Sequence, residues 1–544
     1  MSNAMNHFSG NLTRFPFTVV NPGYPWNLDQ GRKYRPQSYV GLFRDGFDGW
    51  LPYCLVTLLI VAYELRRMIV VFRNRRPQNV KVIGMPSIFG NWLTSIRYCY
   101  ASQEVHNKAY KEGKGEPYAI PTRRRYQVCV SSQKLVEEFS TASIHQVSLR
   151  HALWERAFPE QTIDGLSVDN IDKNGSLSQK VFRHQARLHL PSMQSLLQQR
   201  LDEGFASEID SHKTKGEWMY ISSSGALNRL VTKINNIIIV GDELAQNQQF
   251  FESIVKYIMA AGICEEVLQF TPKAIAPMVG WMIMRGTRIV QNVNKFLIPL
   301  AHERAKNRDS EDKSHKDTVE WIMKARPKAS PEEVAQQTLA YVFGGAYQMP
   351  ILLTFSLYNL CKHPEYLEQL REEIARSNGV HFNHENDEMP LLDSFLKETA
   401  RMNPVTIFGM PRKIMHDYTF SDGTHVPADN WIVVPQQAQM KDPLNYANPE
   451  KFDGFRFVKD VGGQNPTSES RLSHPSWRFP FWGSVRQACP ARFYVTDMTK
   501  LFLKDFIMNY DIKLSNENLP SSFAWGPIRV PHPRLAFLMK QRSH

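Results

Sequence analysis

The sequence predicts a mostly helical protein with short β-strands placed toward both ends of the chain. Between Ser178 and about Phe355 the apolar residues recur mainly at helical spacing. Alternating apolar and polar residues, which are typical of strands, occur only in short runs within 118–130, 405–435 and 520–535. The chain has 544 residues and can therefore bury a large core.

The N-terminal part predicts membrane attachment. Residues 1–49 are expected to be an extension that starts with the tag-like residues Met-Ser-Asn-Ala-Met. Residues 50–72 are largely apolar, and the arginines just after them are typical of a cytoplasmic flank. We predict a single-pass anchor at 50–72 with the body of the chain, 73–544, in the cytoplasm; the alternative is a helix lying on the membrane. With this topology Asn11, in Asn-Leu-Thr, becomes a glycosylation site.

Charge and cysteine content limit the classes of function. The formal net charge of +12 is spread along the chain, which favours a basic surface that attracts anionic lipid or an acidic protein partner. No basic segment is interleaved with aromatic residues, so nucleic-acid binding is not expected. The six cysteines show no paired spacing, which argues against a disulfide framework and against a zinc site.

The first third of the chain predicts a hairpin, a short helix and a loop. Residues 118–121 and 126–130 are expected to pair as strands, 131–139 to form a helix, and 145–178 to be irregular. After this loop, four basic residues share one helical face: Lys180, Arg183, His184 and Arg187. This face is either a solvated surface or a binding surface for a cofactor with two carboxylates.

A long apolar helix is predicted from Val334 to Lys362. Pro350 has no N–H, so the carbonyl of Ala346 loses its helical partner and the helix should kink there. Gly344 and Gly345 beside the kink allow another group to approach the backbone closely. The alternative is a core helix whose kink only serves packing.

Two further segments carry charge or a reactive side chain. Glu398 and Arg401 stand three residues apart on one predicted helix face, a pair that is usually exposed. Cys489 lies in a loop of small and aromatic residues, and Pro490 suits the first turn of the helix that follows. A helix N-terminus favours the thiolate, so Cys489 is a candidate nucleophile, redox thiol or metal ligand; the alternative is a small buried apolar residue.

The loop from Trp482 to Ala491 resembles the haem-binding loop of the cytochromes P-450, in particular the fungal form F-G-H-G-R-H-A-C-P-G. The matching residues are Gly483, Arg486, Ala488, Cys489 and Pro490. The departing residues are Trp482, Ser484, Val485, Gln487 and Ala491. Glu398-Thr399-Ala400-Arg401 matches the family's E-x-x-R, and Arg456 matches its arginine partner. The resemblance covers roughly residues 80–540.

This resemblance implies a mainly α fold with small β-sheets, the cytochrome P-450 fold, and a haem b whose iron is bound by the Cys489 thiolate. It implies a buried charge network of Glu398, Arg401 and Arg456. Further contacts to the haem are expected from five residues: Arg486, Arg183, Arg187, Arg412 and Trp482.

The departures concern the catalytic side of the haem. The pair that delivers protons in most members, an acid or histidine followed by threonine, corresponds here to Tyr347 and Gln348, which can both form hydrogen bonds. With the free carbonyl of Ala346 they are the candidate catalytic groups. The substrate is expected near Gly345, Phe408 and Met410.

In the loop before Cys489, Val485 replaces a glycine of the family's pattern, and a β-branched residue disfavours positive φ.

The resemblance therefore predicts a haem-thiolate monooxygenase of fungal type, anchored in the endoplasmic reticulum membrane. It would oxidise a hydrophobic small molecule, such as a terpenoid intermediate of secondary metabolism. Electrons would come from NADPH through a separate cytochrome P-450 reductase, because the chain has no Gly-rich nucleotide motif. The alternatives are desaturation, rearrangement or coupling chemistry, and a haem-binding relative without catalysis.

Overall fold

The computed structural model describes residues 51–166, 177–211, 218–306, 315–346, 348–377, 389–459, 470–483 and 487–542. It divides into two units, the first ending at Tyr63 and the second running from Glu64 to the C-terminus. The predicted extension 1–49, with Asn11, lies outside the described residues.

The predicted membrane segment is helical. Helix α1 runs from Leu51 to Ile69 and is followed by a π-helical turn, η2, from Val70 to Asn74. Glu64, Arg66 and Arg67 lie inside this helix and not beyond its end. No helix in the described part of the chain has both the length and the apolar character needed to cross a membrane. The single-pass anchor predicted at 50–72 is therefore not found.

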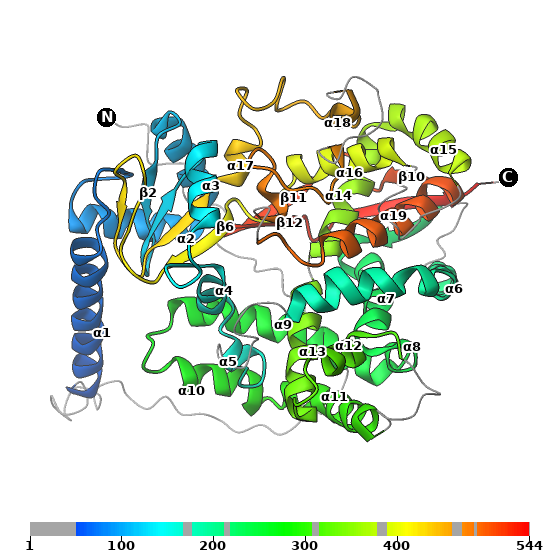
Figure 1. Ribbon diagram of the computed structural model, residues 1–544, viewed down its shortest axis with the longest axis horizontal. Helices are drawn as coiled ribbons and strands as arrows, with labels where there is room; N and C mark the ends of the chain where they lie inside the picture. Colours follow the sequence, from blue (N-terminus) through cyan, green and yellow to red (C-terminus); the bar gives the residue numbers. More distant parts are fainter. Residues whose placement is uncertain are drawn as a thin grey trace, which may run out of the picture. The chain divides into compact units, whose positions relative to one another are not determined.

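A mixed sheet with the helices around it forms one part of the second unit (Figure 1). Its strand order is β1-β2-β3-β9-β6-β4. The strands are β1 (Lys81–Val82), β2 (Tyr118–Pro121), β3 (Tyr126–Cys129), β4 (Val147–Ser148), β6 (Gly409–Ile414) and β9 (Trp431–Val434). The predicted hairpin is β2 and β3, and β9 joins β3 in parallel about three hundred residues later in the chain. Helices α2 (Ile88–Gly113), α3 (Gln133–Thr141) and α4 (Leu149–Ala157) accompany the sheet.

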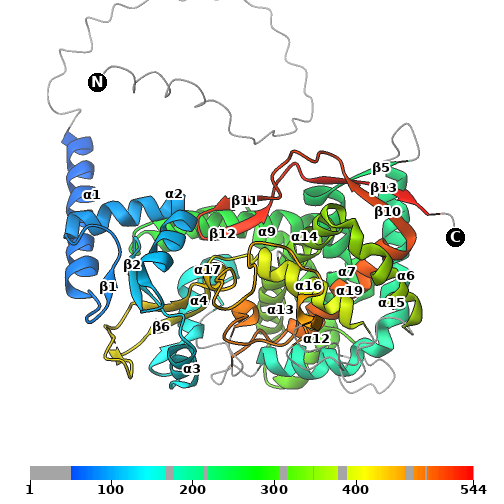
Figure 2. The same ribbon diagram turned by 90° about the horizontal axis from the view of Figure 1, so that it is seen from above.

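The other part of the second unit is helical. In both views its helices lie to the right of strands β2 and β6 (Figures 1 and 2). Its main helices are η3 (Gln179–Ala186), α6 (Arg187–Ser211), α7 (Asn228–Val240), α9 (Gln248–Phe270), α11 (Ile289–Lys306), α12 (Thr318–Ala325), α13 (Pro331–Gly345), α14 (Gln348–Lys362), α15 (Leu367–Arg376), α16 (Pro390–Met402) and α19 (Arg492–Asn509). Most of them share one large apolar core that includes Trp321, Phe395 and Phe506, whereas α9 and most of α11 pack into a second core with Phe250 and Val293. This arrangement confirms the prediction of a mainly helical fold.

Three small sheets complete the fold. Strands β10 (Tyr510–Leu514), β13 (Ala536–Gln541) and β5 (Met219–Ser222) form one of them. The others pair β11 (Ser522–Trp525) with β12 (Ile528–Pro531) and β7 (Tyr418–Thr419) with β8 (His425–Val426). The strands expected in 405–435 and 520–535 are thus present.

The loop predicted at 145–178 was wrong in its first half. Strand β4, helix α4 and helix α5 (Pro159–Thr162) occupy this segment up to Thr162. Local chemistry explains both helices: the Ser148 hydroxyl accepts a hydrogen bond from the N–H of His151 at the start of α4, and Pro159 begins α5. Residues 167–176 lie outside the described part.

The long helix predicted from Val334 to Lys362 is broken where Pro350 requires it. Helix α13 ends at Gly345 and α14 begins at Gln348. The N–H of Ala346 reaches back only to the Phe343 carbonyl, at 3.5 Å. The break lies next to α7 and α19, which both pack against α14.

Candidate active site

Cys489 is held by a tight loop that doubles back on itself. The short helix η9 (Pro480–Trp482) ends at Gly483, whose φ is +92°, and the N–H of Cys489 then donates to the Trp482 carbonyl at 2.7 Å. A Cβ on Gly483 would lie 3.1 Å from the Gln487 carbonyl oxygen. Glycine is therefore required here both by φ and by space. Ser484, Val485 and Arg486 lie outside the described residues, so the predictions about Val485 and Arg486 stay predictions.

The environment of Cys489 differs from the sequence-based expectation. The N–H groups of Ala491 and Arg492 and the Arg492 charge do lower its pKa, as a helix N-terminus should. Burial has the larger effect, however, and raises the pKa of the Cys489 thiol above its ordinary value. Without a metal on the sulfur, the fold therefore favours the thiol and not the thiolate.

One protein ligand does not hold a bare metal ion, and the described residues contain no cluster of three His, Cys, Asp or Glu side chains placed to bind one. The cavity beside Cys489 has a volume of about 170 Å³ and is lined mostly by apolar atoms.

Four helical elements line this cavity. They are η3 with Phe182, α7 with Asn235, the broken α13–α14 helix, and α19 with Tyr494. A Cβ on Gly344 would meet no atom within 4 Å, so this glycine opens the cavity toward the helix break. Gln348, one turn later, is exposed to the same space. The structure thus brings Gly345 and Gln348 to the cavity of Cys489; Tyr347 lies outside the described residues.

Arg412 on β6 fits one carboxylate of a haem. Its side chain is 1% exposed, and its Nη2 has no hydrogen-bond partner in the described structure. Burial lowers its pKa to about 10. Because β6 packs against η9, beside the Cys489 loop, a carboxylate there would complete the hydrogen bonding of this guanidinium.

The other predicted haem contacts are placed differently. The Arg187 guanidinium lies 5.8 Å from the ring centre of Phe493, directly after the Cys489 loop, whereas Arg183 is exposed on η3. The indole N–H of Trp482 donates to the Leu472 carbonyl at 2.7 Å. Trp482 therefore supports the loop, and it is not among the described residues that line the cavity.

Glu398, Arg401 and Arg456 meet in the core. Both side chains of the Glu398–Arg401 pair are 0% exposed, with two hydrogen bonds of 2.7 and 2.8 Å. Arg456 Nε donates to Glu398 Oε2 at 3.1 Å. Backbone carbonyls of Met440 and Ala447 each accept from one of the arginines at 2.6 Å. The weak local signal of an i, i+3 pair becomes a buried three-residue network through the fold.

Two residues expected near the substrate are not at this cavity. Phe408 lines a separate cavity with Tyr98 and Trp431. Met410, at φ +52°, is buried in the apolar core of the mixed sheet. Asn235 and Tyr494 line the cavity but were not among the predicted site residues. Tyr494 could have been predicted because it stands five residues after Cys489, whereas no local sequence feature indicates Asn235.

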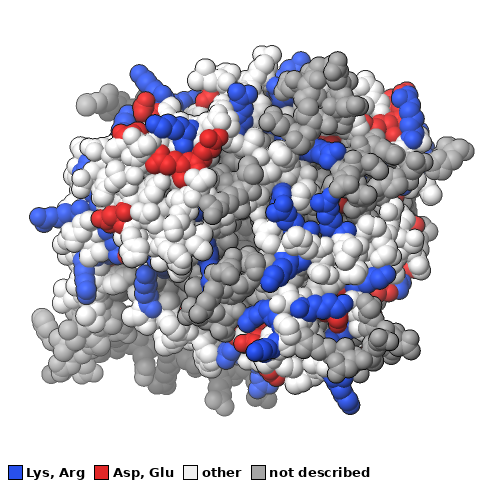
Figure 3. Space-filling model, in the orientation of Figure 1, with Lys and Arg blue, Asp and Glu red and all other residues white. Residues whose placement is uncertain are grey.

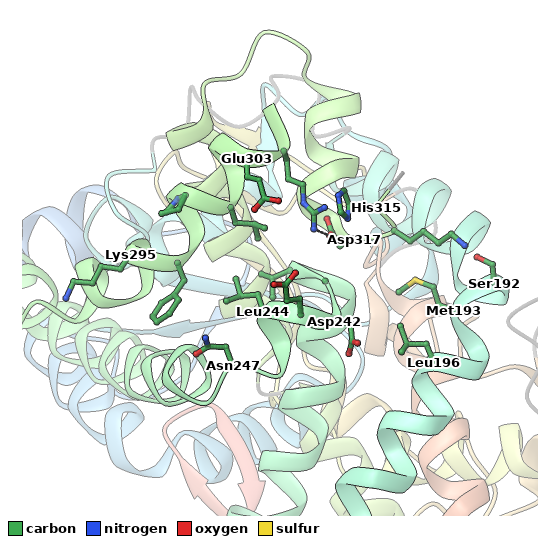
Figure 4. Close-up of a pocket in the computed structure, with 18 residues that line it drawn as sticks. Ser192, Met193, Leu196, Asp242, Leu244, Asn247, Lys295, Glu303, His315 and Asp317 are labelled. Atoms are coloured by element: carbon green, nitrogen blue, oxygen red, sulfur yellow. Dashed lines mark hydrogen bonds and ion pairs between the residues drawn. The ribbon is translucent and has the colours of Figure 1, made fainter. Parts of the chain in front are cut away.

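A larger cavity lies elsewhere, between α6, α11 and the start of α12. Figure 4 shows Asp317, His315 and Glu303 on one side of it and Met193 and Leu196 on another. It shares no lining residue with the cavity of Cys489. Arg304 and Asp317 in its lining are buried and pair with each other at 3.2 Å.

A half-buried cysteine beside a cavity, a broken helix on the cavity wall, and a buried Glu–Arg–Arg network are together typical of the haem-thiolate class of proteins. The family model described as Cytochrome P450 matches residues 85–538. The chain belongs to the cytochrome P450 family, whose members are oxidoreductases that carry a thiolate-ligated haem.

Its relatives include fungal proteins. An ent-kaurene oxidase of Gibberella intermedia is 24% identical, covering 92% of this chain and 95% of that protein. Cytochrome P450 monooxygenase 71 of Postia placenta is 25% identical, covering 80% and 88%. The crystal structure of the cytochrome P450DA haem domain is similar with a TM-score of 0.65 at 14% identity, covering 85% of this chain and 98% of that one. This likeness supports the fold.

Proposed function

We propose that this monooxygenase oxidises a hydrophobic small molecule of the terpenoid class, using dioxygen and electrons from NADPH. The observation that carries the proposal is the cavity in which Cys489 shares space with Gly344, Gly345 and Gln348 at a helix break. The terpenoid class is supported by the ent-kaurene oxidases among the relatives, since ent-kaurene is a diterpene hydrocarbon.

The bound haem would supply the activation of dioxygen. The chain's own residues have four tasks. Cys489 would ligate the iron, and Arg412, with Arg187, would bind the carboxylates. Gly344 would leave the cavity open beside the helix break. Gln348 offers amide donor and acceptor atoms where protons must arrive.

Cys489→Ser tests the assignment. The wild-type protein, reduced under carbon monoxide, should show the red-shifted Soret band of thiolate ligation, and the variant should lose it because an alcohol does not replace the thiolate. Cys361→Ser is the matched control, since Cys361 is another free, partly buried cysteine, at the end of α14. An unchanged band in Cys489→Ser would refute the assignment.

Chemistry other than hydroxylation is the alternative, because the Gln348 side chain is neither an acid nor a small hydroxyl group. Product mass separates hydroxylation from desaturation, rearrangement or coupling. A non-catalytic haem-binding relative would consume no NADPH with a reductase and any candidate substrate.

The electron donor is proposed to be a separate NADPH–cytochrome P-450 reductase. Lys180, Arg183 and His184 are exposed on η3, close in the chain to the cavity wall. Figure 3 shows Lys and Arg side chains gathered over the region of α6 and α19. Such a surface attracts an acidic partner and accelerates its association.

Attachment to the endoplasmic reticulum membrane, with the catalytic unit in the cytoplasm, is proposed through surface contact. Large apolar side chains are exposed along α9, the helix α10 (Ala276–Trp281) and the turn η5 (Met282–Gly286): Met259, Ile263, Phe270, Met278, Trp281 and Met282. Exposed apolar surface of this extent indicates a protein or membrane contact. Within α1, Leu58, Leu59 and Val61 are also exposed.

A further inference from the structure

Asn235 on α7 is a buried amide whose oxygen accepts a hydrogen bond and whose nitrogen donates none to the described residues. It is 6% exposed. The Tyr494 hydroxyl donates to its Oδ1 at 2.6 Å. Burial raises the pKa of Tyr494, so this hydroxyl stays protonated and acts as the donor. The amide Nδ2 has no acceptor among the described residues.

This free donor lies at the break between α13 and α14. A Cβ on Gly345 would be 3.1 Å from Asn235 Nδ2, so glycine is what allows the amide to come this close to the backbone. Asn235 also lines two cavities: one contains Ala346 and Pro350, and the other contains Gln348 and Cys489. The amide therefore borders both the freed backbone carbonyl and the catalytic side of the site.

Asn235 lines both cavities, and its Nδ2 is not among the fully buried side-chain atoms without a hydrogen-bond partner, so water can reach this donor. In a cavity of this size, a water molecule with several polar neighbours satisfies such a group. Besides the tyrosine and serine hydroxyls, the described lining of this cavity offers two side-chain amides for hydrogen bonding, those of Asn235 and Gln348. Together they provide a donor and an acceptor for one water.

We propose that Asn235, oriented by Tyr494, is a positioning residue for proton delivery. Its Nδ2 holds a water that Gln348 also contacts, and this water relays protons into the cavity in place of an acid–alcohol pair. The step is proton transfer alone, with no change of redox state. This inference rests on the proposed monooxygenase function.

The test distinguishes a role of the Asn235 Nδ2 donor in proton delivery from a role of this side chain in packing. Asn235→Leu should increase the share of NADPH that ends as peroxide and reduce product formed per NADPH, by up to about 10²-fold, the lower end for acid–base groups. The substrate KM should not change. The double variant Asn235→Leu/Tyr494→Phe removes both partners of the hydrogen bond, so thermal stability and the carbon-monoxide spectrum should return to wild type. Coupling should stay low.

Asn359→Leu/Thr399→Val is the matched control. Asn359 is also 6% exposed, and its Nδ2 donates to the Thr399 hydroxyl at 3.0 Å, away from the cavity. This pair should leave coupling unchanged. Wild-type coupling in the Asn235→Leu/Tyr494→Phe variant would overturn the inference. A wild-type protein without the thiolate spectrum would instead overturn the proposed function, so the two failures are distinguishable.

Discussion

At the residue scale, Asp505 on α19 is a carboxyl group that the fold buries. It is 5% exposed, and the Gln198 amide donates to it at 2.8 Å. Burial is the main cause that raises its pKa to about 6, and the nearby Asp202 adds to the rise. Between its unfolded pKa near 3.8 and about 6, the folded state binds more protons than the unfolded chain. The contribution of Asp505 to stability therefore falls as the pH rises through this range.

Asp505→Asn should accordingly raise the thermal unfolding midpoint at pH 8 more than at pH 5. The amide keeps an acceptor for Gln198 and removes the buried charge. Asp202→Asn removes the neighbouring charge that adds to the raised pKa of Asp505, so it should shift the midpoint in the same direction by less. An equal shift at both pH values would show that Asp505 does not change its ionisation in the folded protein between pH 5 and pH 8.

At the element scale, the network of Glu398, Arg401 and Arg456 joins helix α16 to the segment before the Cys489 loop. Asp453 contributes its N–H to Glu398 Oε1 at 3.0 Å, so the segment is fastened through its backbone as well. Removing one member of a buried ion pair leaves the other charge without compensation, at a cost of about 3–5 kcal/mol. Two arginines would be affected here.

Glu398→Ala should therefore yield little folded, haem-loaded protein. Glu372→Ala should behave as wild type, because Glu372 pairs with Arg376 on the surface of α15, with side chains 55% and 78% exposed. The measurements are soluble yield and haem per chain. Equal soluble yield and haem content in both variants would contradict the conclusion that this network stabilises the contact between α16 and the segment that contains Arg456.

At the scale of the whole molecule, the exposed apolar surface of α9, α10 and η5 is the proposed membrane contact. Met278 is 57% exposed and Trp281 58%. A lipid surface would bury these side chains, and burial of each contributes about 1.5–3 kcal/mol. Trp is also favoured at membrane interfaces because its ring is apolar and its N–H polar.

Met278→Asp/Trp281→Asp should reduce sedimentation with vesicles of phosphatidylcholine and phosphatidylserine. Leu444→Asp should not, although Leu444 is 91% exposed, because it is an isolated apolar residue on a turn. Equal vesicle binding by both variants and the wild type would exclude this surface as the membrane contact.

Local chemistry made several features predictable from the sequence. Pro350 removes one N–H, so the break between α13 and α14 follows from the residue type alone. Cys489 and the E-x-x-R segment are short contiguous motifs, and the hairpin of β2 and β3 needs only neighbouring residues. These features depend on covalent structure and on contacts within a few residues, which the order of amino acids specifies directly.

Other features depend on packing between distant segments. The parallel pairing of β3 with β9, the approach of Asn235 to Gly345 and the placement of Phe408 away from Cys489 join residues that no local pattern relates. The pKa of Cys489 is the sharpest case, because the helix N-terminus and burial act in opposite directions. The sequence determines the first effect, and only the tertiary structure decides the second, since burial is a property of everything that surrounds the sulfur.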